Sequence, residues 1–282
     1  MKVLLLGSDG TLGTSLQGVD HAGYDLVPWT VENCDLTDLP SITAHLAEES
    51  PDAIINASAY TDVDGAEKNE GLATLINGEA VGQIAMYCAS HGTPLIHFST
   101  DYVFSGSTMV GYTEQDVPSP INAYGRSKLK GETLIAESRC PYLCIRTSRL
   151  FGKSSAVQGK RNFIDTILER AQRHTTISVV DDERTSPTFA DDLARSTFEL
   201  LSSAARGIYH RTNDGDCTWF EFAKEVFSIV QLPVTLIPVR GSAFARAARR
   251  PACSTLKTTK APPLRTWKES LKEYVSINTE TL

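Results

Sequence analysis

The sequence predicts an α/β fold with a doubly wound parallel sheet and a smaller C-terminal lobe. Short apolar segments alternate with helical patterns up to about residue 148, and a glycine-rich turn directly follows the first apolar segment. Beyond residue 148 this alternation loosens. Strands that alternate with helices are typical of parallel sheets covered by helices on both faces, so we expect a fold of the Rossmann type.

The composition excludes several classes of function. The 282 residues are 41% hydrophobic and 22% charged, which is ordinary for a globular protein of one large domain or slightly more. A net charge of -7 and a pI near 5.4 argue against a general nucleic-acid binder. No apolar stretch approaches the roughly 18 residues of a membrane span, and the N-terminal apolar run is too short for a signal peptide. Six scattered cysteines without a C-x-x-C pair favour a cytoplasmic protein with free thiols.

Five segments of the first half have the short, apolar character of buried strands, at residues 3–6, 24–27, 53–56, 95–98 and 143–146. Helical patterns lie between them at residues 12–17, 42–49, 67–91 and 124–137. In parallel sheets of this kind, ligands bind beyond the carboxyl ends of the strands. The glycine-rich turn, Asn56–Tyr60 and Ser99–Asp101 all fall at these ends, so we expect a binding site there.

The first strand leads into Gly7, Gly10 and Gly13, which form the pattern G-x-x-G-x-x-G at the start of a helical segment. Glycines at such a turn let the backbone approach a pyrophosphate, and the helix N-terminus offers free N–H groups and the positive end of its dipole. Similar turns also occur in structural loops. The position directly after an N-terminal strand nevertheless favours a dinucleotide site.

Tyr124 and Lys128 are four residues apart, which places them on one face of the helix predicted at residues 124–137. A nearby ammonium favours the phenolate, so we expect the pKa of Tyr124 to lie below its ordinary value of about 10. Such a phenol can pass a proton to a ketone oxygen, which a hydroxyl of Ser99 or Thr100 can hold in place. The Tyr-x-x-x-Lys pattern is common by chance, but together with the glycine turn it favours an oxidoreductase.

The second half predicts helices at residues 163–173, 191–201, 219–230 and 267–274, and strands at residues 176–180 and 207–211. A polar loop is expected at residues 181–188, and an irregular region rich in proline and arginine at residues 238–263. We expect this half to form a small lobe and to return a strand and a helix to the sheet. Residues 1–148 are therefore predicted to form a dinucleotide-binding domain, joined by about residues 188–212, and residues 149–282 mainly a substrate-binding lobe.

Other residues that often carry chemistry are expected to be structural here. The six histidines lack the spacing of a metal site, and His97 is expected to be a hydrogen-bonded core residue. The acids at positions 181, 182, 191 and 192 are interpreted as solvated loop residues and a helix cap rather than a cation site. Buried positions are expected for Cys140, Cys144, Trp219 and Phe220.

Further segments follow the patterns of a known family. They are Asn56–Glu67, Ser99–Phe104, Tyr112–Glu114, Pro120–Glu132, Ile145–Ser148, Ser186–Thr188 and Ala248–Pro251. Together they resemble the dTDP-4-dehydrorhamnose reductase family of the extended short-chain dehydrogenase/reductase superfamily, and the resemblance extends almost from end to end. The middle segments are specific to this family and its near relatives, whereas the glycine turn marks only the superfamily.

The resemblance implies NAD(P)H-dependent reduction of the 4-keto group of dTDP-4-dehydro-6-deoxy-L-mannose to dTDP-L-rhamnose. Tyr124 would be the general acid, Lys128 would lower its pKa and bind the nicotinamide ribose, and Thr100 would hold the ketone oxygen. The implied cofactor is NADPH or NADH and the implied partner is a nucleotide sugar, bound by a homodimer or a monomer. Neither a nucleic acid nor a membrane is expected as a partner.

The resemblance also assigns binding residues. The cofactor would contact Gly7, Gly10, Thr11, Leu12, Gly13, Asp35, Leu36, Ala59, Tyr60, Thr61, Tyr124 and Lys128. The substrate would contact Thr100, Asp101 and Tyr102. The residue types themselves, rather than the resemblance, make Arg149, Arg249 and Arg250 further candidates for substrate binding. For Arg246, Arg249 and Arg250, a clamp on the substrate diphosphate and a solvated basic loop are alternative interpretations.

Three departures from the family pattern leave alternatives open. Many members have Trp where this chain has Arg149, which can pair with a diphosphate or a carboxylate, so the sugar is open. The second strand ends at Trp29 and Thr30 without an acid for the ribose, so NADH and NADPH both remain. Some relatives hold a metal with a glutamate after the glycine turn, but this chain has Thr14–Leu16 there, so no metal is expected.

Two alternative functions follow from the same residues. The first is a 4-ketoreductase for a different nucleotide-linked deoxysugar, which Arg149 suggests. The second is a non-catalytic, dinucleotide-binding regulatory subunit. The presence of Thr100, Tyr124 and Lys128 together argues against the second, because a site without catalysis need not keep all three.

Overall fold

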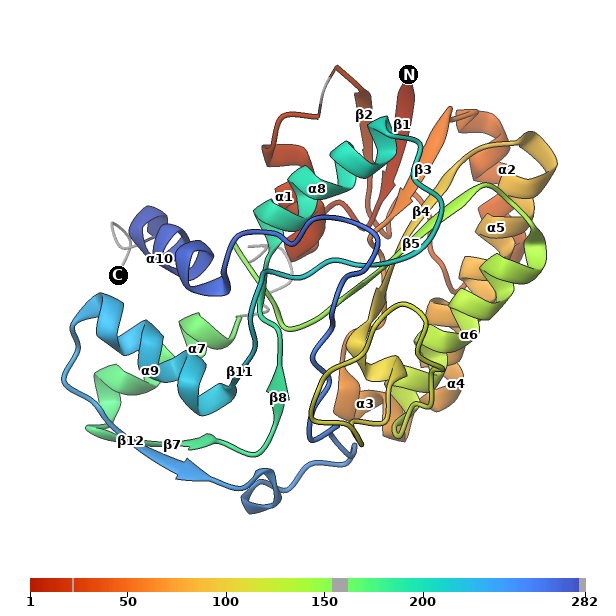
Figure 1. Ribbon diagram of the computed structural model, residues 1–282. Coiled ribbons are helices and arrows are strands. Elements are labelled where there is room, and N and C mark those ends of the chain that lie inside the picture. The colour runs from red at the N-terminus through yellow and green to blue at the C-terminus, as the bar shows by residue number, and fades with distance from the viewer. Residues whose placement is uncertain (22, 154–161, 279–282) are drawn as a thin grey trace.

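The computed structural model describes residues 1–21, 23–153 and 162–278 of the chain. Its central sheet is parallel, with the order β10-β5-β4-β3-β1-β2 (Figure 1). The strands are β1 (Lys2–Leu6), β2 (Asp25–Trp29), β3 (Ala53–Asn56), β4 (Leu95–Thr100), β5 (Tyr142–Thr147) and β10 (Gly207–His210). The chain runs outward from β1 in both directions, so the predicted doubly wound sheet is confirmed.

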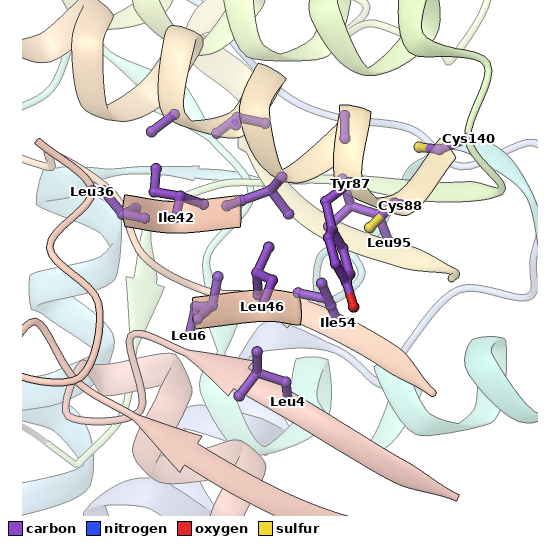
Figure 2. Packing of buried hydrophobic residues seen from close by; sticks show 14 of the residues in the cluster. Leu4, Leu6, Leu36, Ile42, Leu46, Ile54, Tyr87, Cys88, Leu95 and Cys140 are labelled. Carbon is purple, nitrogen blue, oxygen red and sulfur yellow. The ribbon is translucent and has the colours of Figure 1, made fainter. Parts of the chain in front are cut away.

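Helices cover both faces of this sheet (Figure 1). One face carries α1 (Thr11–Gly18) and α8 (Ala190–Ser202). The other face carries α2 (Leu39–Glu49), α5 (Ala80–His91) and α6 (Ala123–Ser138). Leu4 and Leu6 of β1 join the apolar cluster with α2 and α5 (Figure 2), whereas Val3 and Leu5 join the cluster with α1 and α8. Because side chains alternate along a strand, a strand that is covered on both faces needs a continuous apolar run, and Val3–Leu6 is one.

The single helix predicted at residues 67–91 is wrong. The structure has α3 (Val63–Lys68), α4 (Glu70–Thr74), a π-helical turn η1 (Leu75–Glu79) and then α5. Asn69 leaves the helical region, with φ -133° and ψ 53°. In the π turn, the side chain of Asn77 bonds the backbone of Tyr60 and the hydroxyl of Ser127 on α6. Tertiary contacts of this kind override helical periodicity, which is why the pattern alone did not show the breaks.

Two further strands differ from the prediction, and both contain a proline. Strand β2 extends through Pro28 to Trp29, beyond the predicted residues 24–27, and strand β12 (Thr235–Val239) includes Pro238, which was expected to be irregular. Each strand has a single partner strand among the described residues, β1 and β7 respectively. Proline is compatible with an edge strand because the missing N–H can face away from the neighbour.

The smaller lobe has its own aromatic core. It is built by α7 (Phe163–Arg173), β7 (Thr176–Val180), α9 (Trp219–Val230), β12 and α10 (Trp267–Asn278). Two short strand pairs connect it to the central domain: β6 (Leu150–Phe151) with β9 (Thr188–Phe189), and β8 (Arg184–Thr185) with β11 (Cys217–Thr218). Within the ranges that the structure describes, no helix has both the length and the apolar character required to span a bilayer.

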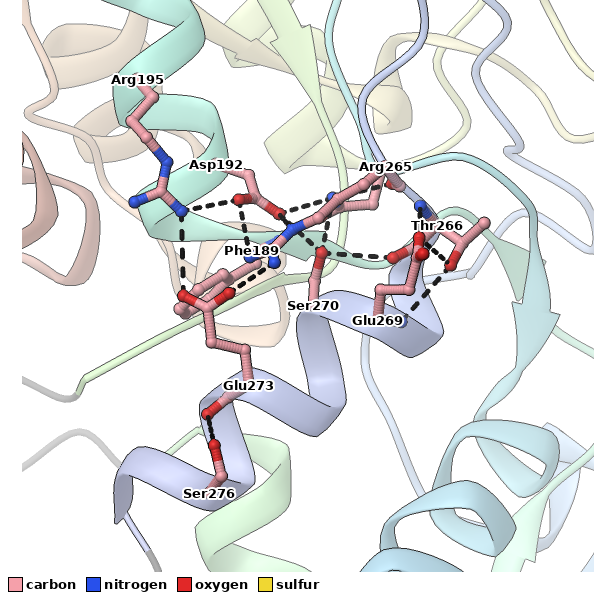
Figure 3. A network of polar contacts seen from close by, with 10 residues as sticks. Phe189, Asp192, Arg195, Arg265, Thr266, Glu269, Ser270, Glu273 and Ser276 are labelled. Atoms are coloured by element: carbon pink, nitrogen blue, oxygen red, sulfur yellow. Dashed lines mark hydrogen bonds and ion pairs between the residues drawn. The ribbon is translucent and has the colours of Figure 1, made fainter.

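A polar network around Asp192 joins α8 to α10 (Figure 3). The carboxylate of Asp192 accepts hydrogen bonds from Arg265 at 2.9 Å, Ser270 at 2.6 Å, Asn213 at 2.8 Å and Arg195 at 2.8 Å. Burial raises the pKa of this carboxyl, but the hydrogen bonds outweigh burial and hold it below its ordinary value. The interpretation of Asp192 as a solvated acid or helix cap is wrong, because its side chain turns inward toward the lobe.

Candidate active site

A cavity of about 660 Å³ lies at the carboxyl ends of the strands, where the strand order reverses at β1. Its walls are the turn after β1, the segment after β3, the end of β4 and the face of α6 that presents Tyr124 and Lys128. A second cavity of about 170 Å³ adjoins it and extends into the smaller lobe. Both cavities are lined by Thr61, Thr100, Asp101, Tyr124 and Arg149.

The turn after β1 fits a pyrophosphate. Gly7 has a φ of +73°, and a Cβ there would lie 2.7 Å from the nitrogen of Ser58, so a larger residue does not fit. Gly10 precedes α1, and no side chain among the described residues caps this helix start. Gly10, Thr11 and Leu12 line the cavity, so the first N–H groups of α1 remain available to an anion.

Most residues predicted to bind the cofactor line the larger cavity. They are Gly7, Gly10, Thr11, Leu12, Asp35, Leu36, Ala59, Thr61, Tyr124 and Lys128. Gly13 and Tyr60 are not among its lining residues. A Cβ on Gly13 would lie 2.2 Å from the carbonyl oxygen of Gly7, so this glycine lets α1 pack tightly against the turn. Tyr60 contributes backbone atoms that Asn77 holds at 2.9 and 3.0 Å.

Helix α6 brings Tyr124 to the end of β4. The side chain of Asn122 caps the helix by accepting the N–H of Gly125 at 2.8 Å. A Cβ on Gly125 would lie 2.1 Å from the carbonyl oxygen of Tyr102, so glycine permits a close approach between the helix start and the segment after β4. The rings of Tyr102 and Tyr124 meet edge to face, with centroids 6.1 Å apart.

The predicted lowering of the Tyr124 pKa is wrong. Burial raises the pKa of Tyr124 to about 12, a hydrogen bond with Thr100 opposes this, and the nearby charge of Asp101 adds to it. The reason is that the phenol is removed from water, and Lys128 is not among the groups that lower its pKa. Tyr124 is therefore protonated at neutral pH, as a proton donor must be.

Lys128 is buried deeply, with 2% of its surface exposed. Its Nζ lies 3.3 Å from Nε2 of His97, which is fully buried on β4. Burial lowers the pKa of Lys128 to about 8. His97 is thus a hydrogen-bonded core residue, as predicted, but it also contacts a residue of the cavity wall.

The hydroxyl groups of Ser99 and Thr100 have different partners. Ser99 donates a hydrogen bond to Glu132, whose carboxylate also accepts bonds from Arg146 at 2.6 and 2.9 Å in a fully buried ion pair. Thr100 donates to Asp101 at 3.0 Å and lines both cavities. Of the two predicted hydroxyls, Thr100 is the one beside Tyr124.

Asp101 organises the wall between the two cavities. Besides the bond from Thr100, its carboxylate accepts hydrogen bonds from Thr185 at 3.0 Å and Ser254 at 2.5 Å. Burial raises the pKa of Asp101, although these three hydroxyls lower it. The acid therefore connects the end of β4 to two segments of the C-terminal half.

Arg149 is the most unusual residue of the site. It adopts a φ of +39°, and its guanidinium carbon lies 3.8 Å from the ring centroid of Trp219. The guanidinium donates to the carbonyl oxygens of Cys217 at 3.0 Å and Glu183 at 3.3 Å, while its buried Nε has no partner among the described residues. Trp219 packs against the core of the smaller lobe, as expected, but it is also a site residue, which its core-like helical position did not indicate.

Arg249 and Arg250 do not line either cavity. Arg250 pairs with Asp64 at 2.8 Å, and its neighbour Arg246 pairs with Glu183. Arg249 is exposed, and its carbonyl oxygen accepts a 2.9 Å hydrogen bond from Asn122. Their predicted contacts with substrate therefore stay a prediction, one that the cavity linings do not support.

Within residues 1–21, 23–153 and 162–278, no group of three or more His, Cys, Asp or Glu side chains is arranged to hold a metal ion. All six cysteines lie in the described part of the chain, where they are buried and unpaired, as predicted for Cys140 and Cys144.

Comparisons with known proteins place this site in a family. Residues 1–279 match the family described as the RmlD substrate binding domain. A dTDP-4-dehydrorhamnose reductase from Burkholderia thailandensis is 36% identical over 295 residues, which cover 98% of this chain and 94% of the relative. The chain belongs to the dTDP-4-dehydrorhamnose reductase family. The predicted resemblance is confirmed, and membership makes this chain a sugar-nucleotide ketoreductase.

Two further relatives show the range of the family. The crystal structure of dTDP-4-dehydrorhamnose reductase from Bacillus anthracis, in complex with NADP, has a TM-score of 0.92 and 35% identity, with 98% of this chain and 99% of that chain covered. A probable dTDP-4,6-dihydroxy-2-methyloxan-3-one 4-ketoreductase from Streptomyces antibioticus is 36% identical, with 97% of this chain and 94% of the relative covered. Family members similar to this chain thus differ in the sugar that their names give.

Proposed function

We propose that the protein reduces the 4-keto group of dTDP-4-dehydro-6-deoxy-L-mannose to dTDP-L-rhamnose, with NADPH or NADH as the hydride donor. The observation that carries this proposal is that Thr100, Tyr124 and Lys128 all line one cavity together with the glycine turn. A reductase needs a proton donor next to the hydride donor, and this cavity has the volume and the anion-binding helix start for a dinucleotide.

The bound nicotinamide supplies a hydride to the carbonyl carbon and becomes oxidised. Tyr124 gives its phenolic proton to the carbonyl oxygen, so a ketone becomes a secondary alcohol and a phenolate remains. Thr100 holds the carbonyl oxygen by turning toward it the hydroxyl proton that Asp101 otherwise accepts. Lys128 bonds the ribose hydroxyls, and in its protonated form it stabilises the phenolate.

The two parts of the chain have different tasks in this proposal. Residues 1–148, with about residues 188–212, bind the dinucleotide, since the cavity walls come mainly from the turns after β1, β3 and β4. Residues 149–282 mainly bind the sugar nucleotide, because the smaller cavity extends toward Glu183, Arg184 and Trp219. Asp101 and Tyr102 shape the wall that faces the sugar.

A second candidate is reduction of a different nucleotide-linked deoxysugar, and Arg149 is the observation that favours it. Its stacked guanidinium lines both cavities and places a cation next to the sugar site. A cation there favours a sugar with an acceptor group, such as a carboxylate or additional hydroxyls, close to the reacting carbon. A regulatory subunit without catalysis is supported less well, since the proton donor and the dinucleotide cavity are both present.

The test is oxidation of reduced nicotinamide by purified protein with dTDP-4-dehydro-6-deoxy-L-mannose and with related dTDP-linked 4-ketosugars. The proposal expects turnover with the first sugar, and product analysis should identify dTDP-L-rhamnose. A clear preference for another ketosugar would support the second candidate instead. Binding of the cofactor without turnover of any ketosugar would support the regulatory subunit.

A further inference from the structure

A chain of hydrogen bonds lies behind Lys128 and has no part in the steps above. The N–H of Ser58 donates to Oδ1 of Asn56 at 3.0 Å, Nδ2 of Asn56 lies 3.3 Å from Nδ1 of His97, and Nε2 of His97 lies 3.3 Å from Nζ of Lys128. Asn56 and His97 are fully buried and pair in register across β3 and β4. The backbone of the sheet therefore fixes this arrangement.

The donor and acceptor of each hydrogen bond follow from what each group can donate. A backbone N–H only donates, so the atom of Asn56 that faces Ser58 is the amide oxygen, and the atom that faces His97 is the amide NH₂. An amide NH₂ only donates, so Nδ1 of His97 accepts. A neutral imidazole that accepts at Nδ1 has its proton on Nε2. That proton points at Nζ of Lys128, and an ammonium has no lone pair to accept it.

We propose that His97 positions Lys128 by donating a hydrogen bond from Nε2 to its unprotonated amine in the cofactor-free protein. An amine held in this way has its lone pair facing His97 and its two N–H groups free to meet a ribose. The inference rests on the proposed function only for what Lys128 then does. His97 acts through Lys128, so it is a positioning residue and does not itself touch substrate or cofactor.

The groups around Lys128 are compatible with an unprotonated amine. Tyr124 and Glu132 face it from its own helix, His97 from β4 and Cys144 from β5. Both oxygens of Glu132 already accept bonds from Arg146. Burial keeps the pKa of His97 well below its ordinary value, so the ring is neutral, and burial also depresses the pKa of Lys128.

The test is long-range ¹H–¹⁵N NMR of the cofactor-free protein labelled with ¹⁵N-histidine, recorded at pH 10, where an amine with a pKa of about 8 is unprotonated. This spectrum distinguishes the two neutral tautomers and the imidazolium, and the signal of His97 is assigned by its loss in His97→Gln. We expect the Nε2–H tautomer. The Nδ1–H tautomer or an imidazolium would overturn the inference. The measurement uses neither substrate nor cofactor, so its outcome does not depend on whether the proposed reduction occurs.

A second experiment reverses the direction of these hydrogen bonds. In Asn56→Asp, the carboxylate accepts from Nδ1, so the proton of His97 should move there and Nε2 should accept from a protonated Lys128. We expect the Nδ1–H tautomer, and an increase of about one unit or more in the apparent pKa of kcat/KM assigned to Lys128. Exposed His174→Gln serves as the control and should leave the pH profile unchanged. An unchanged tautomer in Asn56→Asp would contradict the inference, and if this variant does not fold, the spectrum of the unmodified protein decides.

Discussion

The guanidinium of Arg149 stacks on the ring of Trp219, with 3.8 Å between the guanidinium carbon and the ring centroid. Two backbone carbonyl groups hold the same guanidinium from the side, which leaves its Nε as a buried donor without a partner in the described part of the chain. Buried donors are costly unless they are satisfied, so this one is suited to a group that arrives with the substrate.

Arg149→Ala is expected to lower kcat/KM for the nucleotide sugar about tenfold or more, because a charge-assisted hydrogen bond to substrate is lost. Trp219→Ala is expected to have a similar effect, since the guanidinium then loses its stacking surface. Steady-state kinetics at saturating cofactor measure both. Arg173→Ala, on an exposed part of α7, is the control. Equal kinetics for Arg149→Ala and the control would show that Arg149 does not contact the sugar nucleotide.

Glu132→Gln is expected to lower the free energy of unfolding by about 3–5 kcal/mol, because it leaves the buried Arg146 without its partner charge. Urea denaturation measures this loss. The matched control is Glu70→Gln, which removes an exposed ion pair with Arg126 on the same helix α6 and should cost less than about 1 kcal/mol. Similar losses in the two variants would show that burial of the Glu132 pair has little energetic effect.

Asp192→Asn is expected to make the free energy of unfolding depend less on pH in acid. The folded pKa of Asp192 is held below its ordinary value of 3.8, so its contribution to stability is complete above that value and is lost as the pH falls through the folded pKa. The variant should therefore be less stable at pH 7, by on the order of 3 kcal/mol, and its stability should change less below about pH 4. Thermal unfolding between pH 7 and pH 3 tests this, and parallel curves for the two proteins would contradict it.

Gly7→Ala is expected to weaken cofactor binding more than tenfold, because its Cβ would collide with Ser58 at the turn that meets the pyrophosphate. Gly92→Ala is the matched control, since it has a similar φ of +69° but open space around the added Cβ. Both variants lose some stability from the left-handed conformation, about 1–2 kcal/mol. Calorimetric titration with NADPH should separate them; equal affinities would remove the assigned role of the turn.

The parts of the fold that local patterns determine were predictable from the sequence. The continuous apolar run of Val3–Leu6 indicated a strand buried on both faces, and the spacing of Gly7, Gly10 and Gly13 indicated the turn after it. The breaks between Val63 and Glu79 were not predictable in this way. They depend on contacts between this segment and α6, which lies about 50 residues further along the chain.

In the candidate site too, local spacing was predictable from the sequence, whereas contacts between distant segments were not. The i,i+4 spacing placed Tyr124 and Lys128 on one face of a helix, and both line the cavity. The direction of the Tyr124 pKa shift was predicted wrongly, because spacing shows which groups are close but not how deeply they are buried. Trp219 and Arg149 are 70 residues apart, and the contact between them depends on how β11 and α9 pack beside β6.

Tyr124 delivers its proton inside the dinucleotide cavity in the proposed reaction, and the turnover of Tyr124→Phe tests this role. With NADPH and dTDP-4-dehydro-6-deoxy-L-mannose, kcat should fall on the order of a hundredfold or more while the Kd for NADPH changes little. Tyr24→Phe, far from the cavity, is the control and should retain full turnover. Undiminished kcat in Tyr124→Phe would show that Tyr124 is not the proton donor.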